Sequence, residues 1–307
     1  MTLLFTDTEV ADRLDAPTAV EAMREALLAA YAGRLVAPPR ASAPLRGGRV
    51  VTTAGQLDDE WYGFRSYDTF GHAEAEQLVV LHDGRSGRIR AIAVGEEIGS
   101  RRTGAIGGVA VDALARPDAA TVGVLGAGRQ AWTQLWATAA VRPLREVAVY
   151  CRTPSVRDAF AARVEAELGI SATAVSSARA AVRERDVVLV ATDSVTPVLD
   201  PADLAPGAHV NVVGFKQQGR AEFGPDLLDR AGVLVTDSPA QAMDYQPPML
   251  AALAPYVDRL HHLGAVLAGA VPGRTGADQV TLFCLVGLAG TEVLLLDRLA
   301  RVAARRP

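Results

Sequence analysis

The chain has 307 residues and a mass of 32.2 kDa, enough for one large hydrophobic core or two ordinary ones. Half of its residues are hydrophobic and its formal net charge is −4, a composition typical of a globular α/β protein without the basic field that attracts nucleic acid. Its cysteines, Cys151 and Cys284, are too few for a disulfide framework or a zinc site, and we expect no metal. With no apolar run long enough to span a bilayer and no basic leader, we expect a cytoplasmic protein with no membrane partner.

The N-terminal third mixes helical and strand-like patterns. Residues 15–34 predict a helix with Asp15 as its N-cap and Gly33 near its end. After a proline-rich connection over 37–48, four runs are typical of strands, at 49–57, 61–70, 76–83 and 88–95. The turn at 83–87 predicts a hairpin between the last two runs. A helix rich in small residues is expected over 101–115.

From Thr121 onward, strands and helices alternate. Runs rich in Val and Leu predict strands buried on both faces of a parallel sheet, at 121–128, 146–152, 171–176, 186–192, 209–214 and 231–237. The tail at 276–306 has one long helical pattern that we expect to pack on the N-terminal domain and not in the sheet. The predicted fold class is α/β: a doubly wound parallel sheet of the Rossmann type over 119–277, and an α+β domain over 1–118 completed by the C-terminal helix of 278–307.

A glycine-containing turn follows the first of these strands. Gly126, Gly128 and Ala131 form the pattern G-x-G-x-x-A. The first glycine allows a tight turn, the second lets the backbone approach a pyrophosphate, and the alanine lets the helix pack closely on the strand. The N–H groups at the start of that helix, around Arg129 and Gln130, face the same anion. Because the turn joins a strand to a helix, it predicts a dinucleotide site and not merely a steric turn.

The end of the second strand bears on the choice of dinucleotide. An acidic residue there normally binds the ribose hydroxyls of NAD, but this chain has Arg152 and Thr153. Arg152 can pair with a 2′-phosphate and Thr153 can hydrogen-bond to it, with no carboxylate at this point to repel it. These residues favour NADP(H) over NAD(H). The alternative is a solvated arginine beside a threonine that caps the next helix.

Several segments, in this order, resemble the ornithine cyclodeaminase/μ-crystallin family: 101–116, 123–137, 149–153, 188–200, 209–214 and 273–293. The resemblance implies a homodimer whose N-terminal domain, completed by the C-terminal helix, carries the substrate site and the dimer contact. It also implies a nicotinamide cofactor that interconverts an amine and an imine next to a carboxylate.

By the same resemblance, Arg40 and Arg102 correspond to the pair that holds the substrate carboxylate. A guanidinium can grip a carboxylate through two parallel hydrogen bonds and so orient the α-carbon; the alternative is that both are ordinary surface charges. Further residues expected at the cofactor site are Thr103 at a helix start, Thr192 and Ser194 after the fourth strand, and Val213 and Gly214 after the fifth.

Two positions depart from the cyclodeaminase pattern. Arg65 stands where cyclodeaminases carry an acid/base lysine; because arginine stays protonated, it can hold an anion but is a poor base. It could also be a strand residue that points to solvent. Lys216 stands where cyclodeaminases place an aspartate near the substrate amine, which favours a less cationic or more anionic substrate. Lys216 is either a proton donor, if burial lowers its pKa, or a loop lysine in water.

The remaining protonatable candidates are Asp68, Tyr67 and His72, of which His72 lies in an expected turn. We therefore expect an NADP(H)-dependent oxidoreductase that reduces an imine of a 2-oxo acid, either cyclic or made from an amine. Arg65, Lys216 and Asp68 are its candidate catalytic residues. The alternatives are a cyclodeaminase that releases ammonia and a non-enzymatic NADPH-binding protein.

Overall fold

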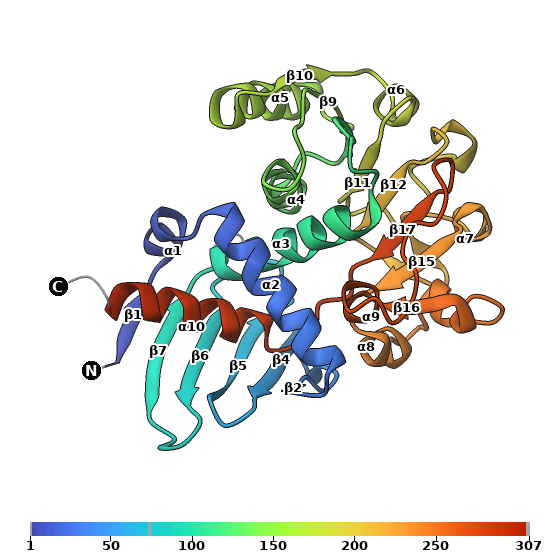
Figure 1. Cartoon of the computed structure of the whole chain (residues 1–307). Helices are drawn as coiled ribbons and strands as arrows, with labels where there is room; N and C mark the ends of the chain where they lie inside the picture. Colours follow the sequence, from blue (N-terminus) through green and yellow to red (C-terminus); the bar gives the residue numbers. More distant parts are fainter. Residues whose placement is uncertain (1, 73–74, 305–307) are drawn as a thin grey trace. The chain divides into compact units, whose positions relative to one another are not determined.

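The computed structural model describes residues 2–72 and 75–304 and divides the chain into two compact units (Figure 1). Unit 1 comprises Met1–Arg102 and Gly287–Pro307, and unit 2 comprises Thr103–Val286. The division falls inside the helix α3 (Glu97–Leu114), which covers the helix predicted over 101–115. Over the described part of the chain, no helix combines the length and the apolar character that crossing a bilayer requires.

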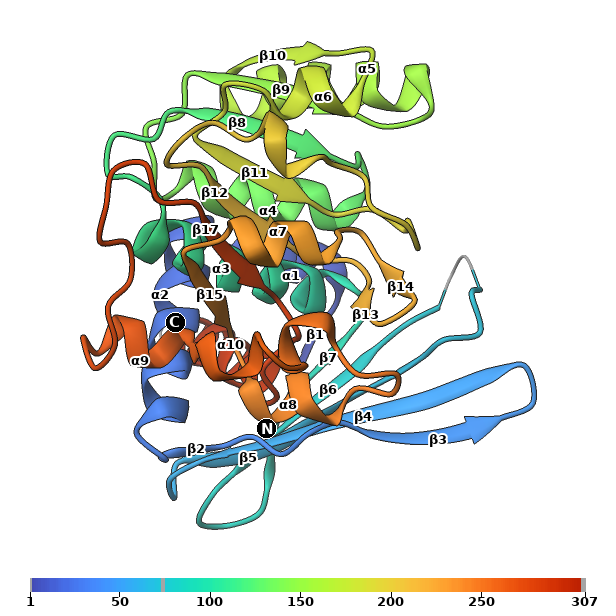
Figure 2. The ribbon, with the colours of Figure 1, turned by 90° about the vertical axis from the view of Figure 1, so that its right-hand side faces the viewer.

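Unit 1 is built on a seven-stranded sheet. Its path runs through β1 (Leu3–Phe5), β7 (Ile89–Val94), β6 (Leu78–Asp83), β5 (Trp61–Asp68), β4 (Gly48–Leu57) and β2 (Leu35–Val36), with β3 (Ala41–Leu45) paired to β4. β1 is parallel to β7 and the other pairs are antiparallel. The four predicted strands and the β6–β7 hairpin are confirmed. β3 was missed because it lies in the proline-rich connection, which pairs with β4 as the long hairpin in Figure 2.

Helices cover one face of this sheet. They are α1 (Asp7–Arg13), α2 (Ala16–Tyr31) and α10 (Thr291–Ala304). The start of α2 is as predicted, because the Asp15 carboxylate accepts a hydrogen bond from the N–H of Thr18 at 2.9 Å. The C-terminal helix α10 packs against α2 and against β5, β6 and β7 (Figure 1). Its buried leucines complete the core of unit 1, each contributing roughly 2 kcal/mol through removal from water.

Unit 2 is built on an eight-stranded sheet in which every pair is parallel. Its order is β10 (Ser171–Ala174), β9 (Glu146–Tyr150), β8 (Thr121–Leu125), β11 (Val187–Val190), β12 (His209–Val212), β17 (Thr281–Cys284), β15 (Val233–Thr236) and β16 (Leu260–His262). The six predicted strands are all present. From β8 the chain adds β9 and β10 on one side and then returns to add β11 and β12 on the other. Ligands of such sheets bind at the carboxyl ends of the strands beside the point where this order reverses.

The helices of unit 2 lie on both faces of its sheet. They include α4 (Arg129–Ala139), α5 (Pro154–Leu168), α6 (Ala178–Val182), α7 (Pro225–Arg230), α8 (Pro239–Asp244) and α9 (Leu263–Leu267), with short 3₁₀ turns at Pro201–Asp203, Leu250–Ala252 and Val257–Arg259. A small antiparallel hairpin is formed by β13 (Lys216–Gln217) and β14 (Arg220–Ala221). Two hydrophobic cores result, one with Leu135 and Phe160 and the other with Leu227 and Leu282.

The prediction of one long helix for the C-terminal tail was wrong. Thr281–Cys284 forms β17, which is fully buried between β12 and β15, and helix begins only at Thr291. A short apolar run has no period that separates a buried strand from a buried helix. Gly287 and Gly290, with φ of 89° and 79°, turn the chain out of the strand before α10 starts.

Candidate functional site

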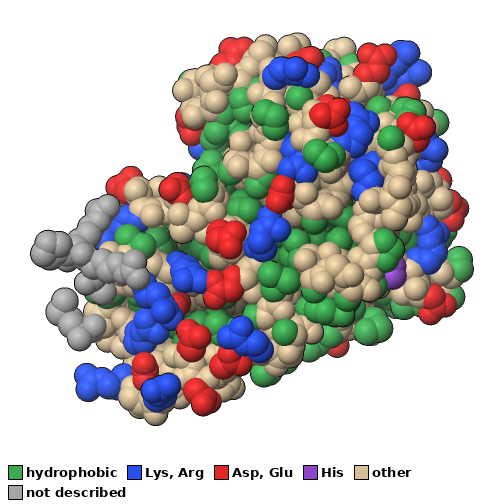
Figure 3. Space-filling view, in the orientation of Figure 1, with side chains coloured by type: hydrophobic (Ala, Val, Ile, Leu, Met, Phe, Trp, Pro, Cys, Tyr) green, Lys and Arg blue, Asp and Glu red, His purple; other side chains and the backbone are tan. Residues whose placement is uncertain are grey.

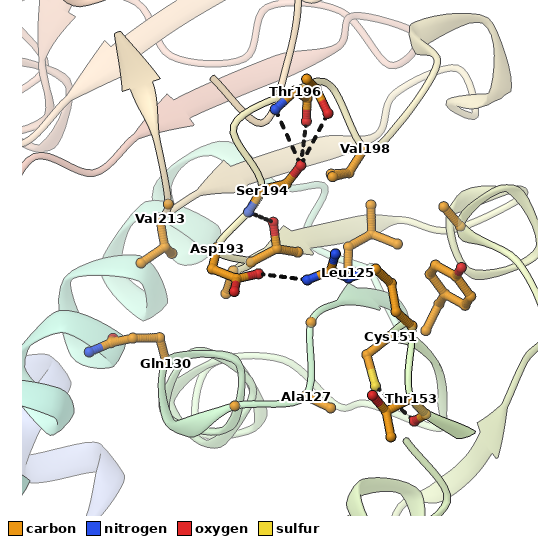
Figure 4. Close-up of a pocket in the computed structure, with 18 of the residues that line it drawn as sticks. Leu125, Ala127, Gln130, Cys151, Thr153, Asp193, Ser194, Thr196, Val198 and Val213 are labelled. Atoms are coloured by element: carbon orange, nitrogen blue, oxygen red, sulfur yellow. Dashed lines mark hydrogen bonds and ion pairs between the residues drawn. The ribbon is translucent and has the colours of Figure 1, made fainter. Parts of the chain in front are cut away.

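A cavity of about 780 Å³ opens along the carboxyl ends of β8, β9, β11 and β12 in unit 2 (Figure 4). Ten of the predicted cofactor residues line it: Gly126, Gly128, Arg129, Gln130, Arg152, Thr153, Thr192, Ser194, Val213 and Gly214. They come from four separate segments of the chain. They lie around one cavity because the carboxyl ends of parallel strands meet at the same edge of the sheet.

The two glycines of the turn have different surroundings. Gly126 has φ of +103° and donates its N–H to the carbonyl of Tyr150 at 2.9 Å, and a Cβ there would overlap the carbonyl oxygen of Ala191. Gly128 is the N-cap of α4, and nothing lies within 4 Å of the place its Cβ would take. The first glycine is thus required by the fold, while the second keeps open the space in front of the N-terminus of α4, where N–H groups attract an anion.

The arginine at the end of β9 has a carboxylate beside it. Nη2 of Arg152 lies 3.4 Å from Oδ1 of Asp193, and both side chains are 86% exposed. The expectation that no carboxylate stands at this point was wrong, because Asp193 reaches it from the loop after β11 (Figure 4). Thr153 is the N-cap of α5, but its side chain makes no capping hydrogen bond. Its hydroxyl is therefore not committed to the helix.

A buried glutamate that the sequence did not suggest supports the other end of the cavity. Oε1 of Glu222 accepts hydrogen bonds from the N–H and the hydroxyl of Thr192, each at 2.5 Å. A Cβ on Gly214 would overlap the same carboxylate. Burial raises the pKa of Glu222, and the hydrogen bonds from Thr192 oppose that shift. Glu222 therefore joins the ends of β11 and β12, from which Thr192 and Gly214 line the cavity.

Lys216 is buried, with only 3% of its surface exposed. Its Nζ donates hydrogen bonds to the carbonyls of Val213, at 3.0 Å, and of Gly214. The alternative of a loop lysine in water was therefore wrong. The ammonium lies directly behind two residues that line the cavity.

Thr103 does not stand at a helix start, as had been expected. It lies within α3, which begins at Glu97, and it is not among the described residues that line the cavity. Its carbonyl accepts a hydrogen bond from Nε2 of Gln134 at 3.0 Å. The helix extends further toward its N-terminus than the pattern suggested, because Glu97 and Arg101 add a salt-bridged first turn.

In unit 1, Arg65 and Arg102 are buried, at 9% and 7% exposure. Both approach the same oxygen of Glu292: Oε1 lies 2.8 Å from Nη1 of Arg65 and 2.8 Å from Nε of Arg102. The remaining nitrogens of Arg65, Nε and Nη2, donate to Oε1 of Gln77 at 2.9 and 2.6 Å. The guanidinium of Arg65 also lies 4.2 Å above the ring of Tyr67. Neither arginine is the surface charge that the alternative interpretation allowed.

Arg40, just before β3, reaches the same place. Its Nη1 donates to the hydroxyl of Tyr67 at 3.3 Å. Nη2 of Arg40 and both terminal nitrogens of Arg102 lie within 3.5 Å of the point that a Cβ of Gly287 would occupy. Because Gly287 has no side chain, the two guanidiniums face a common space. A carboxylate in that space would meet donors from both.

The other predicted proton donors are less involved. The carboxylate of Asp68 accepts a hydrogen bond from the N–H of Phe70 at 2.9 Å, and His72 is exposed. His209 is buried between Thr281 and Asn211, and His262 caps α9. The described residues include no group of three or more His, Cys, Asp and Glu side chains arranged to hold a metal.

A doubly wound parallel sheet, a glycine turn after its first central strand and a cavity along its carboxyl edge define a dinucleotide-binding protein. Comparison with known proteins narrows the class. The model of the ornithine cyclodeaminase/mu-crystallin family matches residues 1–299, and the chain belongs to this family.

Relatives and solved structures agree with that assignment. Delta(1)-pyrroline-2-carboxylate reductase of Bacillus cereus is 31% identical over 233 residues, covering 75% of this chain and 71% of that protein. The structure of Delta(1)-pyrroline-2-carboxylate reductase of Thermococcus litoralis with NADH and L-proline has a TM-score of 0.90 and 28% identity, covering 99% of this chain and 97% of that one. The iminosuccinate reductase of Paracoccus denitrificans with NAD+ has a TM-score of 0.88 and 25% identity, covering 99% and 97%. The chain is an oxidoreductase with a nicotinamide dinucleotide cofactor.

Proposed function

We propose that the protein reduces a C=N bond next to a carboxylate, converting a cyclic imino acid, or an imine formed from a 2-oxo acid and an amine, to an amino acid. The observation that carries this proposal is the convergence of Arg40 and Arg102 on one space beside Gly287. The relatives support it, because reductases of a cyclic imino acid and of iminosuccinate are among them.

When bound, the dihydronicotinamide supplies the hydride that the imine carbon accepts, and the imine nitrogen takes a proton. The chain's own residues bind and orient. Arg40 and Arg102 hold the carboxylate by charge-assisted hydrogen bonds, so that the neighbouring C=N bond has one orientation. Arg65 takes no part in proton transfer, because its donors are engaged by Gln77 and Glu292 and a guanidinium stays protonated.

The proton comes from Lys216 in this proposal. Its ammonium contacts the carbonyls of Val213 and Gly214, which line the cofactor cavity. Asp68 and water are the alternative donors. In a Lys216→Met variant, kcat is expected to fall by about 10²-fold, the usual contribution of a positioned acid. A fall of that size in Asp68→Asn, with kcat retained in Lys216→Met, would transfer the role to Asp68.

For the cofactor, we propose NADP(H), with Arg152 and Thr153 at the 2′-phosphate. β9 ends without an acidic residue that would bind ribose hydroxyls, and the hydroxyl of Thr153 makes no capping hydrogen bond. Asp193 opposes this preference, because its carboxylate lies beside Arg152. The 2′-phosphate would take the place of Asp193 as the partner of Arg152.

We also propose that the protein acts as a homodimer in which unit 1 provides the contact. Apolar side chains of its sheet, Tyr62, Leu78 and Ile89, are 38%, 37% and 40% exposed. Light scattering of the purified protein measures the mass, and a monomer at micromolar concentration would contradict this proposal.

The activity is tested by following the absorbance of NADPH, then NADH, with cyclic imino acids and with 2-oxo acids plus amines. Arg102→Ala is expected to lower kcat/KM by about 10²-fold or more, because the carboxylate loses a bidentate partner. Arg90→Ala is the matched control, since Arg90 also pairs with an acidic residue of α10, Asp297, at 2.8 Å. Ammonia released from ornithine would favour a cyclodeaminase, and tight NADPH binding without turnover would favour a binding protein.

A further inference from the structure

Two buried guanidiniums in unit 1 share one buried carboxylate. Glu292 is 1% exposed, and its Oε1 lies 2.8 Å from both Arg65 and Arg102. Although burial disfavours its ionised form, Arg102 and Arg65 together hold the pKa of Glu292 below its usual range. The charge of Glu292 balances one guanidinium and leaves the other. A buried cation without a counter-charge is unfavourable, so this cluster is built to receive one further anion.

The two arginines are not equivalent in this cluster. Every nitrogen of Arg65 has a protein partner, two on Gln77 and one on Glu292. Arg102 differs: its Nε meets Glu292 as an ion pair at 2.8 Å without making a hydrogen bond, and its Nη1 is buried with no hydrogen-bond partner among the described residues. That nitrogen lies 3.1 Å from the point where a Cβ of Gly287 would be. The unpaired donor therefore faces the space that Gly287 leaves open.

We infer that Glu292 is a positioning residue: its one oxygen balances the charge of Arg65, fixes Arg102 through Nε, and directs the Nη1 edge of Arg102 toward the substrate carboxylate. Glu292 does not touch the substrate in this arrangement and acts through Arg102. The inference rests on the proposed function, because it assigns the open donor of Arg102 to the carboxylate of an imino acid. It makes the tail of the chain a determinant of substrate affinity, since Glu292 lies in the first turn of α10.

Glu292→Gln separates positioning from simple counter-charge by the sign of the change in KM. Loss of positioning weakens the grip of Arg102, and KM for the imino acid should rise about tenfold while kcat changes less. If Glu292 were only a counter-charge, its removal would leave more positive charge beside the substrate, and KM should fall. The Kd for the dinucleotide, measured by fluorescence, should be unchanged and shows that unit 2 is intact.

Two further variants keep the result interpretable. Glu292→Asp retains the charge but withdraws the oxygen by one methylene, so positioning predicts that KM rises here as well, even if Glu292→Gln fails to fold. Asp297→Asn is the matched control, because Asp297 is a buried carboxylate of the same helix that pairs with Arg90 and Arg301 at 2.8 and 2.6 Å. Its KM should equal that of the wild type.

The failure of this inference differs from the failure of the proposed function. An active wild type whose KM is unchanged or lower in Glu292→Gln and unchanged in Glu292→Asp overturns the role of Glu292 alone. A rise of KM in Asp297→Asn equal to that in Glu292→Gln also overturns it, because the effect would then be a general weakening of α10. A wild type that turns over no imine of any kind overturns the proposed function, and the role of Glu292 with it.

Discussion

Glu222 and Thr192 are joined by two hydrogen bonds to one carboxylate oxygen, although the residues lie 30 positions apart in the chain. The bonds connect the loop after β11 to the segment that follows the β13–β14 hairpin. Because Thr192 lines the cofactor cavity, the carboxylate determines the shape of that end of the cavity without contacting it.

The first prediction concerns the pH dependence of stability. Burial raises the pKa of Glu222 in the folded protein. The stabilisation that its protonated form provides is therefore fully present below the pKa that Glu222 has in the unfolded chain, and it is lost as the pH rises through the pKa of Glu222 in the folded protein. The wild type should therefore lose free energy of unfolding, measured in urea, as the pH rises from about 4 toward neutrality, and Glu222→Gln should lack this loss. Parallel curves for the two proteins would contradict this.

Cofactor selection gives the second prediction. Arg152→Ala should weaken NADPH by about tenfold, the loss of one charge-assisted contact, and leave NADH nearly unchanged. Asp193→Asn should strengthen NADPH, because it removes the carboxylate 3.4 Å from Arg152. Equilibrium titration of cofactor fluorescence measures all four affinities. Equal effects of Arg152→Ala on the affinities for both cofactors would show that Arg152 does not bind the 2′-phosphate.

The third prediction contrasts the two glycines of the turn. Gly126→Ala should lower the free energy of unfolding by about 2 kcal/mol or more, because its φ is +103° and its Cβ would overlap the carbonyl of Ala191. Gly128→Ala should unfold like the wild type but bind dinucleotide more weakly, since its methyl group enters the space for the pyrophosphate. Denaturant unfolding and cofactor titration of both variants separate these effects. Similar stability losses in both would remove the distinction.

A buried histidine gives the fourth prediction. Burial lowers the pKa of His209 to about 3. Its buried ring forms hydrogen bonds with Thr281 and Asn211 at 2.8 and 2.7 Å. A histidine whose pKa is lowered by folding contributes its full stabilisation above the pKa that it has in the unfolded chain, and this contribution is lost as the pH falls below that value. The free energy of unfolding should therefore decrease by about 1.4 kcal/mol per pH unit between about pH 6 and pH 4. In His209→Gln this part of the slope should be missing.

The sequence was sufficient for six of the eight strands of the sheet in unit 2 and for half of the residues that line its cavity. Continuous runs of Val and Leu predict buried parallel strands, and the residues that follow such strands must meet at one edge. The surface charge pattern also agrees with the composition, since Figure 3 shows basic and acidic side chains interspersed on the face it presents.

Ion pairs between residues far apart in the chain could not be predicted from the sequence. Glu292 meets Arg65 across 227 positions of the chain, and Asp193 meets Arg152 across 41. No local pattern distinguishes these acids from solvated ones, because their partners are set by the packing of distant elements. The prediction for β17 failed for a different reason, because its apolar residues fit a buried helix as well as a buried strand.

The place of β17 has a consequence for how the chain is completed during synthesis. Until residues 281–284 have left the ribosome, β12 and β15 have no strand between them, and the sheet of unit 2 is divided into two parts. The same tail then continues into α10, which closes the core of unit 1. Unit 1 is made of two separate segments of the chain, and unit 2, although continuous, has β17 near its end, so a premature stop anywhere before β17 leaves both of them unfinished.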